Sequence, residues 1–190
     1  MELILNAAKE VCDFMRARRW KFCLIGGLVV ERWGKPRLTQ DVDITLLTGF
    51  GNEESYVNIL LEHFPARYDD AQDFALVNRV LLIYTGNGTP VDISLGALPY
   101  EEEVVKHSTP FAFSDGITLP TCSADDLFVL KIFAARPKDL MDAEGIVVRQ
   151  GGKLRRRYIL SRLTMLCDAT DRPELVVMAE KILEGKPWHK

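Results

Sequence analysis

The stretch RLTQDVDI (residues 37–44) places two carboxylates two positions apart in what is otherwise the composition of a β-strand. Side chains of a strand alternate between its faces, so Asp41 and Asp43 share one face about 6.6 Å apart, while their apolar neighbours share the other. A third carboxylate, Asp92, has the same apolar flanks in VDIS. If the two strands are neighbours, three carboxylates converge on one face of a sheet.

Three converging carboxylates repel one another unless cations compensate them. Oxygen ligands suit hard divalent ions, and Mg²⁺ is bound by a few carboxylates together with substrate phosphates. The alternative is that these aspartates line the solvated face of an antiparallel sheet. The upstream residues favour the metal site, because Gly26 and Gly27 follow the apolar strand KFCLI. A glycine pair at a strand-to-helix turn lets backbone N–H groups approach a phosphate closely.

A second group of polar residues lies in LKIFAARPKDLMD (residues 130–142). Lys131 is four residues after Leu127 and falls on an apolar helical stripe, so an inward-facing lysine with a phosphate or carboxylate partner is predicted. A surface lysine that snorkels to water is the alternative. Asp139 and Asp142 occupy adjacent turns of the next helix, and two interpretations stay open: a complement to its N-terminal charge, or a substrate contact.

The composition is that of a soluble globular protein: 190 residues, 47% hydrophobic and 27% charged. No apolar run approaches the roughly 20 residues of a membrane span, so we expect a cytoplasmic protein with no membrane partner. A net charge of −3 excludes a uniformly basic surface. The segment 149–162 carries six basic residues and no acidic one. Its cluster KLRRRYILSR (residues 153–162) is interpreted as a solvated helix start, with RNA-backbone contact as the alternative.

Hydrophobic periodicity divides the chain into a mixed first part and a helical second part. Helices are predicted over residues 2–18, 28–33, 55–64, 99–107, 123–135, 137–150, 154–168 and 172–184. Strands are predicted over 21–25 and 41–47, in a hairpin of 74–85 with 91–96 around GNGTP, and in a hairpin within 110–119. The fold class is therefore α+β, with residues 1–120 as the core and residues 121–190 as a C-terminal helical subdomain.

The ordered motifs LIGG, RLTQDVDITL and VDIS resemble those of the polymerase β-like nucleotidyltransferase fold, a small mixed sheet flanked by helices. The Arg-x-Thr-x-Asp-x-Asp form resembles the nucleotidyltransferase toxins of the AbiEii/AbiGii type in particular. Their C-terminal signature, a helical Lys followed by an Arg and an Asp-x-x-Asp, has its counterpart in Lys131, Arg136, Asp139 and Asp142. The resemblance spans residues 22–142.

This resemblance implies a role for each matching residue. Asp41 and Asp43 would hold the metal, and Asp92 would complete the site and act as the base toward an attacking hydroxyl. The remaining implied roles are triphosphate binding by Gly26 and Gly27, orientation of the acidic strand or phosphate contact by Arg37 and Thr39, catalysis by Lys131, and nucleotide binding by Asp139 and Asp142. The implied cofactor is a pair of Mg²⁺ ions, with Mn²⁺ as an alternative.

The function implied is transfer of a nucleoside monophosphate from an NTP to tRNA or to a protein, in a toxin–antitoxin or phage-defence setting with a cognate antitoxin. Two alternatives stay open at this point. One is a small-molecule transferase of the kind that modifies antibiotics. The other is a non-catalytic nucleotide-binding module on the same fold.

Overall fold

The computed structural model describes residues 1–186 and 188 and divides the chain into two compact units. The first unit comprises Met1–Leu28 and Leu38–Cys122. The second comprises Val29–Arg37 and the chain from Ser123 onward. Helix α2 (Gly26–Trp33) runs from the first unit into the second.

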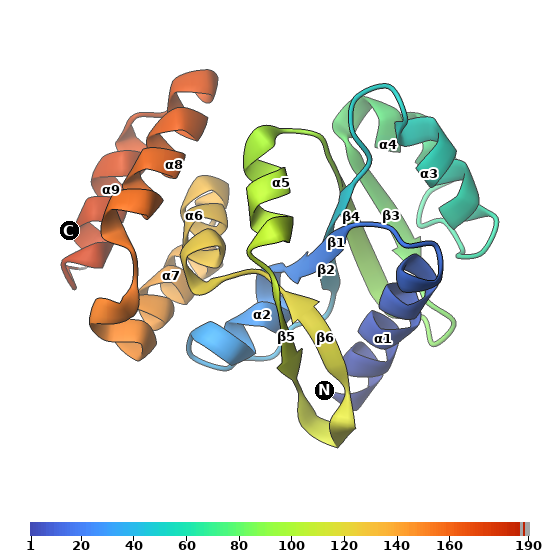
Figure 1. Ribbon diagram of the computed structural model, residues 1–190, viewed down its shortest axis with the longest axis horizontal. Coiled ribbons are helices and arrows are strands. Elements are labelled where there is room, and N and C mark those ends of the chain that lie inside the picture. The colour runs from blue at the N-terminus through green and yellow to red at the C-terminus, as the bar shows by residue number, and fades with distance from the viewer. Residues whose placement is uncertain (187, 189–190) are drawn as a thin grey trace. The chain divides into compact units, whose positions relative to one another are not determined.

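The first unit contains one six-stranded mixed sheet in the order β3-β4-β2-β1-β6-β5 (Figure 1). Its strands are β1 (Phe22–Ile25), β2 (Val42–Leu47), β3 (Val80–Tyr84), β4 (Pro90–Gly96), β5 (Thr109–Ala112) and β6 (Thr118–Thr121). β2 is parallel to β4 and β1 is parallel to β6, whereas the other neighbours are antiparallel. The predicted α+β class is confirmed, and the two acidic strands are neighbours.

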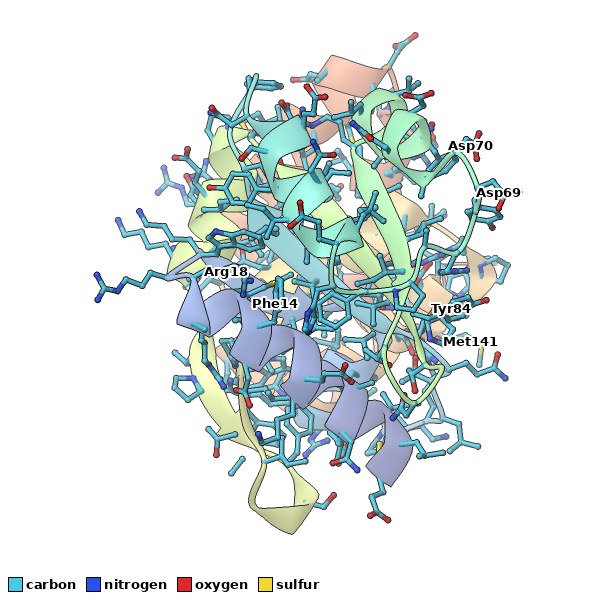
Figure 2. All side chains as sticks on the ribbon, turned by 90° about the vertical axis from the view of Figure 1, so that its right-hand side faces the viewer. Phe14, Arg18, Asp69, Asp70, Tyr84 and Met141 are labelled. Atoms are coloured by element: carbon cyan, nitrogen blue, oxygen red, sulfur yellow. The ribbon has the colours of Figure 1, made fainter. Side chains whose placement is uncertain are left out.

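The first unit also contains the helices α1 (Glu2–Ala17), α3 (Glu53–Leu61), α4 (Ala71–Asn78) and α5 (Pro99–Lys106). α1 contacts β2 and β6. Its apolar positions recur at helical spacing, and residues such as Ala8 and Val11 are fully buried. Near its C-terminal end the Arg18 guanidinium lies 3.5 Å from the centre of the Phe14 ring (Figure 2). This cation–π contact lies at the C-terminal end of α1.

The two faces of β2 have different surroundings. Val42, Ile44 and Leu46 are fully buried on one face, where each aliphatic side chain contributes about 1.5–3 kcal/mol by leaving water. The other face carries Asp43 and Thr45, of which Thr45 is buried and Asp43 only half-buried. α5 contacts β1 and β2. The polar face of β2 therefore changes from buried to accessible between Thr45 and Asp43.

One predicted strand is in part a helix. The run 74–85 was expected to be a single strand, but Ala71–Asn78 form α4 and the strand β3 begins only at Val80. Ala71 and Ala75, four residues apart, are both buried, which is helical spacing. A left-handed Arg79, at φ 54°, separates the helix from the strand. Apolar letters on both sides of Asn78 and Arg79 concealed this change of period.

The second unit is helical and contains α6 (Ala124–Ala134), α7 (Pro137–Gln150), α8 (Arg156–Thr170) and α9 (Glu174–Leu183). Ser123 caps the start of α6, because its hydroxyl accepts a hydrogen bond from the Asp126 N–H at 3.1 Å. Ala135 is left-handed and ends α6, and Pro137 starts α7. Across the residues described, no helix is both long and apolar enough to cross a bilayer.

Candidate active site

The carboxylates of Asp41, Asp43 and Asp92 come together in the first unit. β2 and β4 pair in parallel register with Asp43 directly beside Asp92, and Asp41 immediately precedes β2. One carboxylate oxygen of each residue lies within 4.8 Å of the corresponding oxygens of the other two. All three residues are half-buried. The sheet register therefore gathers three oxygen ligands at a partly accessible position, and such a set fits a hard divalent cation.

Gly26 and Gly27 lie against one side of Asp43. The Gly27 N–H donates a hydrogen bond to Oδ2 of Asp43 at 3.2 Å. A Cβ built on Gly26 would lie 1.9 Å from the same oxygen, and Gly26 has a left-handed φ of +68°. Space and backbone conformation thus both require glycine at position 26. The glycine turn therefore packs directly against Asp43 of the acidic strand.

Thr39 precedes the acidic strand and contacts its first aspartate. Its hydroxyl donates a hydrogen bond to Oδ1 of Asp41 at 2.9 Å, and the residue is buried. A buried hydroxyl that donates to a carboxylate restricts the carboxylate's orientation. Thr39 is therefore placed to orient Asp41.

Arg67 also belongs to the site, although no sequence motif indicated it. Its Nη1 donates to Oδ1 of Asp92 at 2.5 Å, in a salt bridge whose side chains are 23% and 35% exposed. The two residues are 25 positions apart in the chain. Pairing of residues 65–67 with the edge of the sheet brings Arg67 to Asp92, and no local periodicity encodes such a contact.

The other predicted residues form a buried ionic cluster within the second unit. Lys131 is 4% exposed, and its Nζ lies 2.8 Å from Oδ1 of Asp139 and 2.9 Å from Oδ2 of Asp142. Arg37 contacts Asp142 through Nε and Nη2, both at 2.7 Å. Arg136 contacts Asp139 at 2.5 Å. Lys131 is inward-facing, as predicted, and its partners here are two carboxylates.

These contacts lower the pKa values of both carboxyl groups. Burial alone would raise the pKa of Asp139, but the hydrogen bonds from Arg136 and Lys131 outweigh burial and hold that pKa below its ordinary value. For Asp142 the opposing hydrogen bonds come from Arg37 and Lys131, and the pKa is again lowered. Both aspartates are therefore charged at neutral pH.

Several arginines of the basic segment 149–162 are engaged with other residues of the second unit. Arg149 donates to the carbonyls of Glu31 and Gly34, both at 2.8 Å. Arg155 pairs with Asp125 at 2.6 Å, which raises the pKa of Arg155. Arg156 pairs with Glu184 at 3.2 Å, and Arg162 lies 5.3 Å from the Tyr158 ring centre. Much of this charge has intramolecular partners.

No protein-family model and no curated protein matches this sequence. Solved structures do match the fold. An antigenic nucleotidyltransferase-like protein from Paracoccidioides brasiliensis aligns with a TM-score of 0.54 and 14% identity, over 97% of this chain and 94% of that chain. The antibiotic-resistance factor ANT(2'')-Ia aligns with a TM-score of 0.55 and 13% identity, over 91% and 95% of the two chains.

A third structure, the lincosamide antibiotic adenylyltransferase LnuA, aligns with a TM-score of 0.50 and 11% identity, over 72% of this chain and 92% of that chain. At such identities the similarity establishes the fold alone. The chain has the nucleotidyltransferase fold, which confirms the predicted fold.

Replacing Gly26 by Ala should disturb Asp43 directly. The new Cβ must displace the carboxylate, in addition to the backbone strain of a left-handed alanine, about 1–2 kcal/mol. Gly88→Ala is the matched control, because Gly88 has φ +78° and nothing within 4 Å of the built Cβ. Urea unfolding should show a larger loss of stability for Gly26→Ala than for Gly88→Ala. Equal losses would contradict the packing of Gly26 against Asp43.

Replacing Lys131 by Met should destabilise the protein strongly, because two buried carboxylates lose a shared cation. Removing one partner of a buried ion pair costs about 3–5 kcal/mol in unfolding free energy. Lys138→Met removes an exposed lysine of α7 and should change stability by less than about 0.5 kcal/mol. Denaturant titration of both variants measures the difference. Equal stability of the two variants would show that the contacts of Lys131 do not contribute to the free energy of unfolding.

The same cluster makes stability sensitive to acid. The pKa values of Asp139 and Asp142 are lowered from an ordinary 3.8 in the folded protein, so the unfolded chain binds protons first. Their contribution is complete above the unfolded pKa and is lost as the pH falls below about 4 through the folded values. The difference in unfolding free energy between wild type and an Asp139→Asn/Asp142→Asn variant should shrink from pH 6 to pH 3. A constant difference would contradict the lowered pKa values.

Proposed function

We propose that this protein is a metal-dependent nucleotidyltransferase that moves a nucleoside monophosphate from an NTP to an acceptor hydroxyl. The observation that carries the proposal is the triad of Asp41, Asp43 and Asp92, held in register beside the glycine turn. Three carboxylates that converge at a half-buried position repel one another unless nearby charges or hydrogen-bond donors compensate them. The solved structures that share this fold include nucleotidyltransferase-like proteins, and this analogy supports the same chemistry here.

The three aspartates would hold Mg²⁺, in two sites as the resemblance implies, or Mn²⁺. When bound, the metal supplies neutralisation of phosphate charge and activation of the attacking oxygen. The oxygen-only donor set and its spread of 4.8 Å fit this group. Thr39 holds Asp41, the Gly27 N–H holds Asp43 and Arg67 holds Asp92, so all three ligands have an orienting contact before any cation enters.

In the proposed reaction the acceptor oxygen attacks the α-phosphorus of the NTP. A new P–O bond forms, the bond from the α-phosphorus to the bridging oxygen breaks, and pyrophosphate leaves with the electron pair of that bond. Asp92 takes the proton of the acceptor hydroxyl. The start of α2 at Gly26 would contribute N–H donors and positive potential to the triphosphate.

The residues of the second unit are proposed to contribute to nucleotide binding through their cluster. Arg37 and Lys131 hold Asp142, and Lys131 also holds Asp139. A phosphate contact by Lys131 would require exchange of one of its carboxylate partners. Arg37 is two positions before Thr39 in the chain, and its bidentate pair with Asp142 holds it within the second unit.

Two acceptor classes are proposed. The resemblance to toxins of the AbiEii type favours tRNA or a protein, with a cognate antitoxin in a cytoplasmic defence system. A small hydroxylated molecule is favoured by a specific observation: Arg149, Arg155 and Arg156, which could have bound RNA phosphates, are paired within the chain.

The test is incubation of the protein with each α-³²P-labelled NTP and Mg²⁺, in separate reactions with total tRNA, with protein extract and with a panel of hydroxylated antibiotics. The wild-type protein should transfer the label to one of these three classes of acceptor. Asp43→Asn should lose at least about 100-fold in rate, because a charge that stabilises the transition state is removed. Asp13→Asn is the control, since Asp13 is an exposed partner of Lys9 and Arg16 on α1.

Nucleotide binding provides the second measurement. Calorimetric titration with each NTP in the presence of Mg²⁺ should show binding by wild type and by Asp13→Asn, with loss in Asp43→Asn. Binding that survives in a folded Asp43→Asn protein would contradict the metal site. Binding without transfer to any acceptor would favour the non-catalytic module.

A further inference from the structure

Arg67 lies on a short segment that extends the sheet beyond its edge strand β3. The Arg67 N–H donates to the Leu82 carbonyl at 3.1 Å, and the Tyr84 N–H donates to the Pro65 carbonyl at 2.8 Å. Tyr84, labelled in Figure 2, is the last residue of β3. The two hydrogen bonds fix the backbone of residue 67 independently of its side chain. Substitution of the side chain therefore leaves these backbone contacts available.

A row of residues across the sheet connects Arg67 with the carboxylates. Leu82 is opposite Asp92 in the pairing of β3 with β4, and Asp92 is beside Asp43 in the pairing of β4 with β2. Arg67 is hydrogen-bonded to Leu82 through its backbone, so its long side chain reaches across one strand to Asp92. The contact follows from the register of three strands and an added segment.

The guanidinium alters the charge of the site. Three carboxylates and one guanidinium carry two formal negative charges, which one divalent cation neutralises. The guanidinium of an arginine is a planar, delocalised cation. A cation bound by Asp92 must therefore sit near a fixed positive charge.

We propose that Arg67 is a positioning residue that holds Asp92 and sets the affinity of the aspartate triad for divalent cations. The inference rests on the proposed function, since it assumes that the triad binds metal. A unit charge within a few ångströms of a divalent ion changes its affinity by about tenfold even in a water-like dielectric. Arg67 thus orders Asp92 when no cation is bound. Its positive charge also lowers the affinity of the triad for a cation.

Binding of Mn²⁺ to the full-length protein tests this inference without any need for catalysis. Free Mn²⁺ is followed by electron paramagnetic resonance as protein is titrated. Arg67→Gln and Arg67→Met, which remove the charge, should bind Mn²⁺ about tenfold more tightly than wild type. Arg67→Lys keeps the charge and should stay within about twofold of wild type. Arg16→Gln removes an exposed arginine that pairs with Asp13 and should bind as wild type does.

Tightening is the diagnostic result, because merely structural damage would weaken binding. Unchanged or weaker binding in folded Arg67→Gln and Arg67→Met proteins would overturn the role of Arg67 and leave the metal site standing. No Mn²⁺ binding by wild type would instead overturn the proposed metal site, and the inference with it. Thermal melts monitored by circular dichroism identify the variants that are folded.

Discussion

The parallel register of β2 with β4 is the constraint on which the site depends, because it places Asp43 directly beside Asp92. Like charges on neighbouring strands destabilise a sheet unless their surroundings compensate them. Each aspartate of the triad has such a contact: a hydroxyl for Asp41, a backbone N–H for Asp43 and a guanidinium for Asp92. The contacts come from three separate segments that precede or flank the strands. The surrounding fold is arranged to keep a locally unfavourable charge pattern in place.

The helical unit handles charge in a different way. Lys131, Asp139 and Asp142 are almost fully withdrawn from water, and their charges are balanced by one another and by two arginines. The desolvation of buried ions offsets much of their attraction, so such clusters define an arrangement more than they add stability. Here the arrangement joins α6 to α7 across the sharp turn at Ala135. The triad residues are half-buried, whereas Lys131, Asp139 and Asp142 are almost fully buried.

Much of the fold followed from local sequence signals, whereas several contacts of the site did not. Strict alternation around Asp43 predicted β2, and the Gly and Pro residues of GNGTP predicted the hairpin of β3 with β4. The helix α4 was missed because its apolar letters were taken together with those of β3, although Asn78 and Arg79 stand between the two elements. Arg67 was missed because its partner is set by the register of other strands. The pair of Lys131 with Asp139 had a sequence signal. The lysine lies on the apolar face of one predicted helix, and the aspartate lies eight positions later at the start of the next helix.

The segment that carries Arg67 has one more consequence, which concerns association between molecules. β3 is an outer strand of the sheet, and outer strands offer unpaired backbone groups to other chains. The Pro65 carbonyl and the Arg67 N–H engage the outward groups of Tyr84 and Leu82. The opposite outer strand, β5, contains Pro110, which has no N–H to offer. The loop that delivers a guanidinium to the carboxylates therefore also protects the sheet from edge-to-edge aggregation, so shortening it would reduce solubility as well as alter the site.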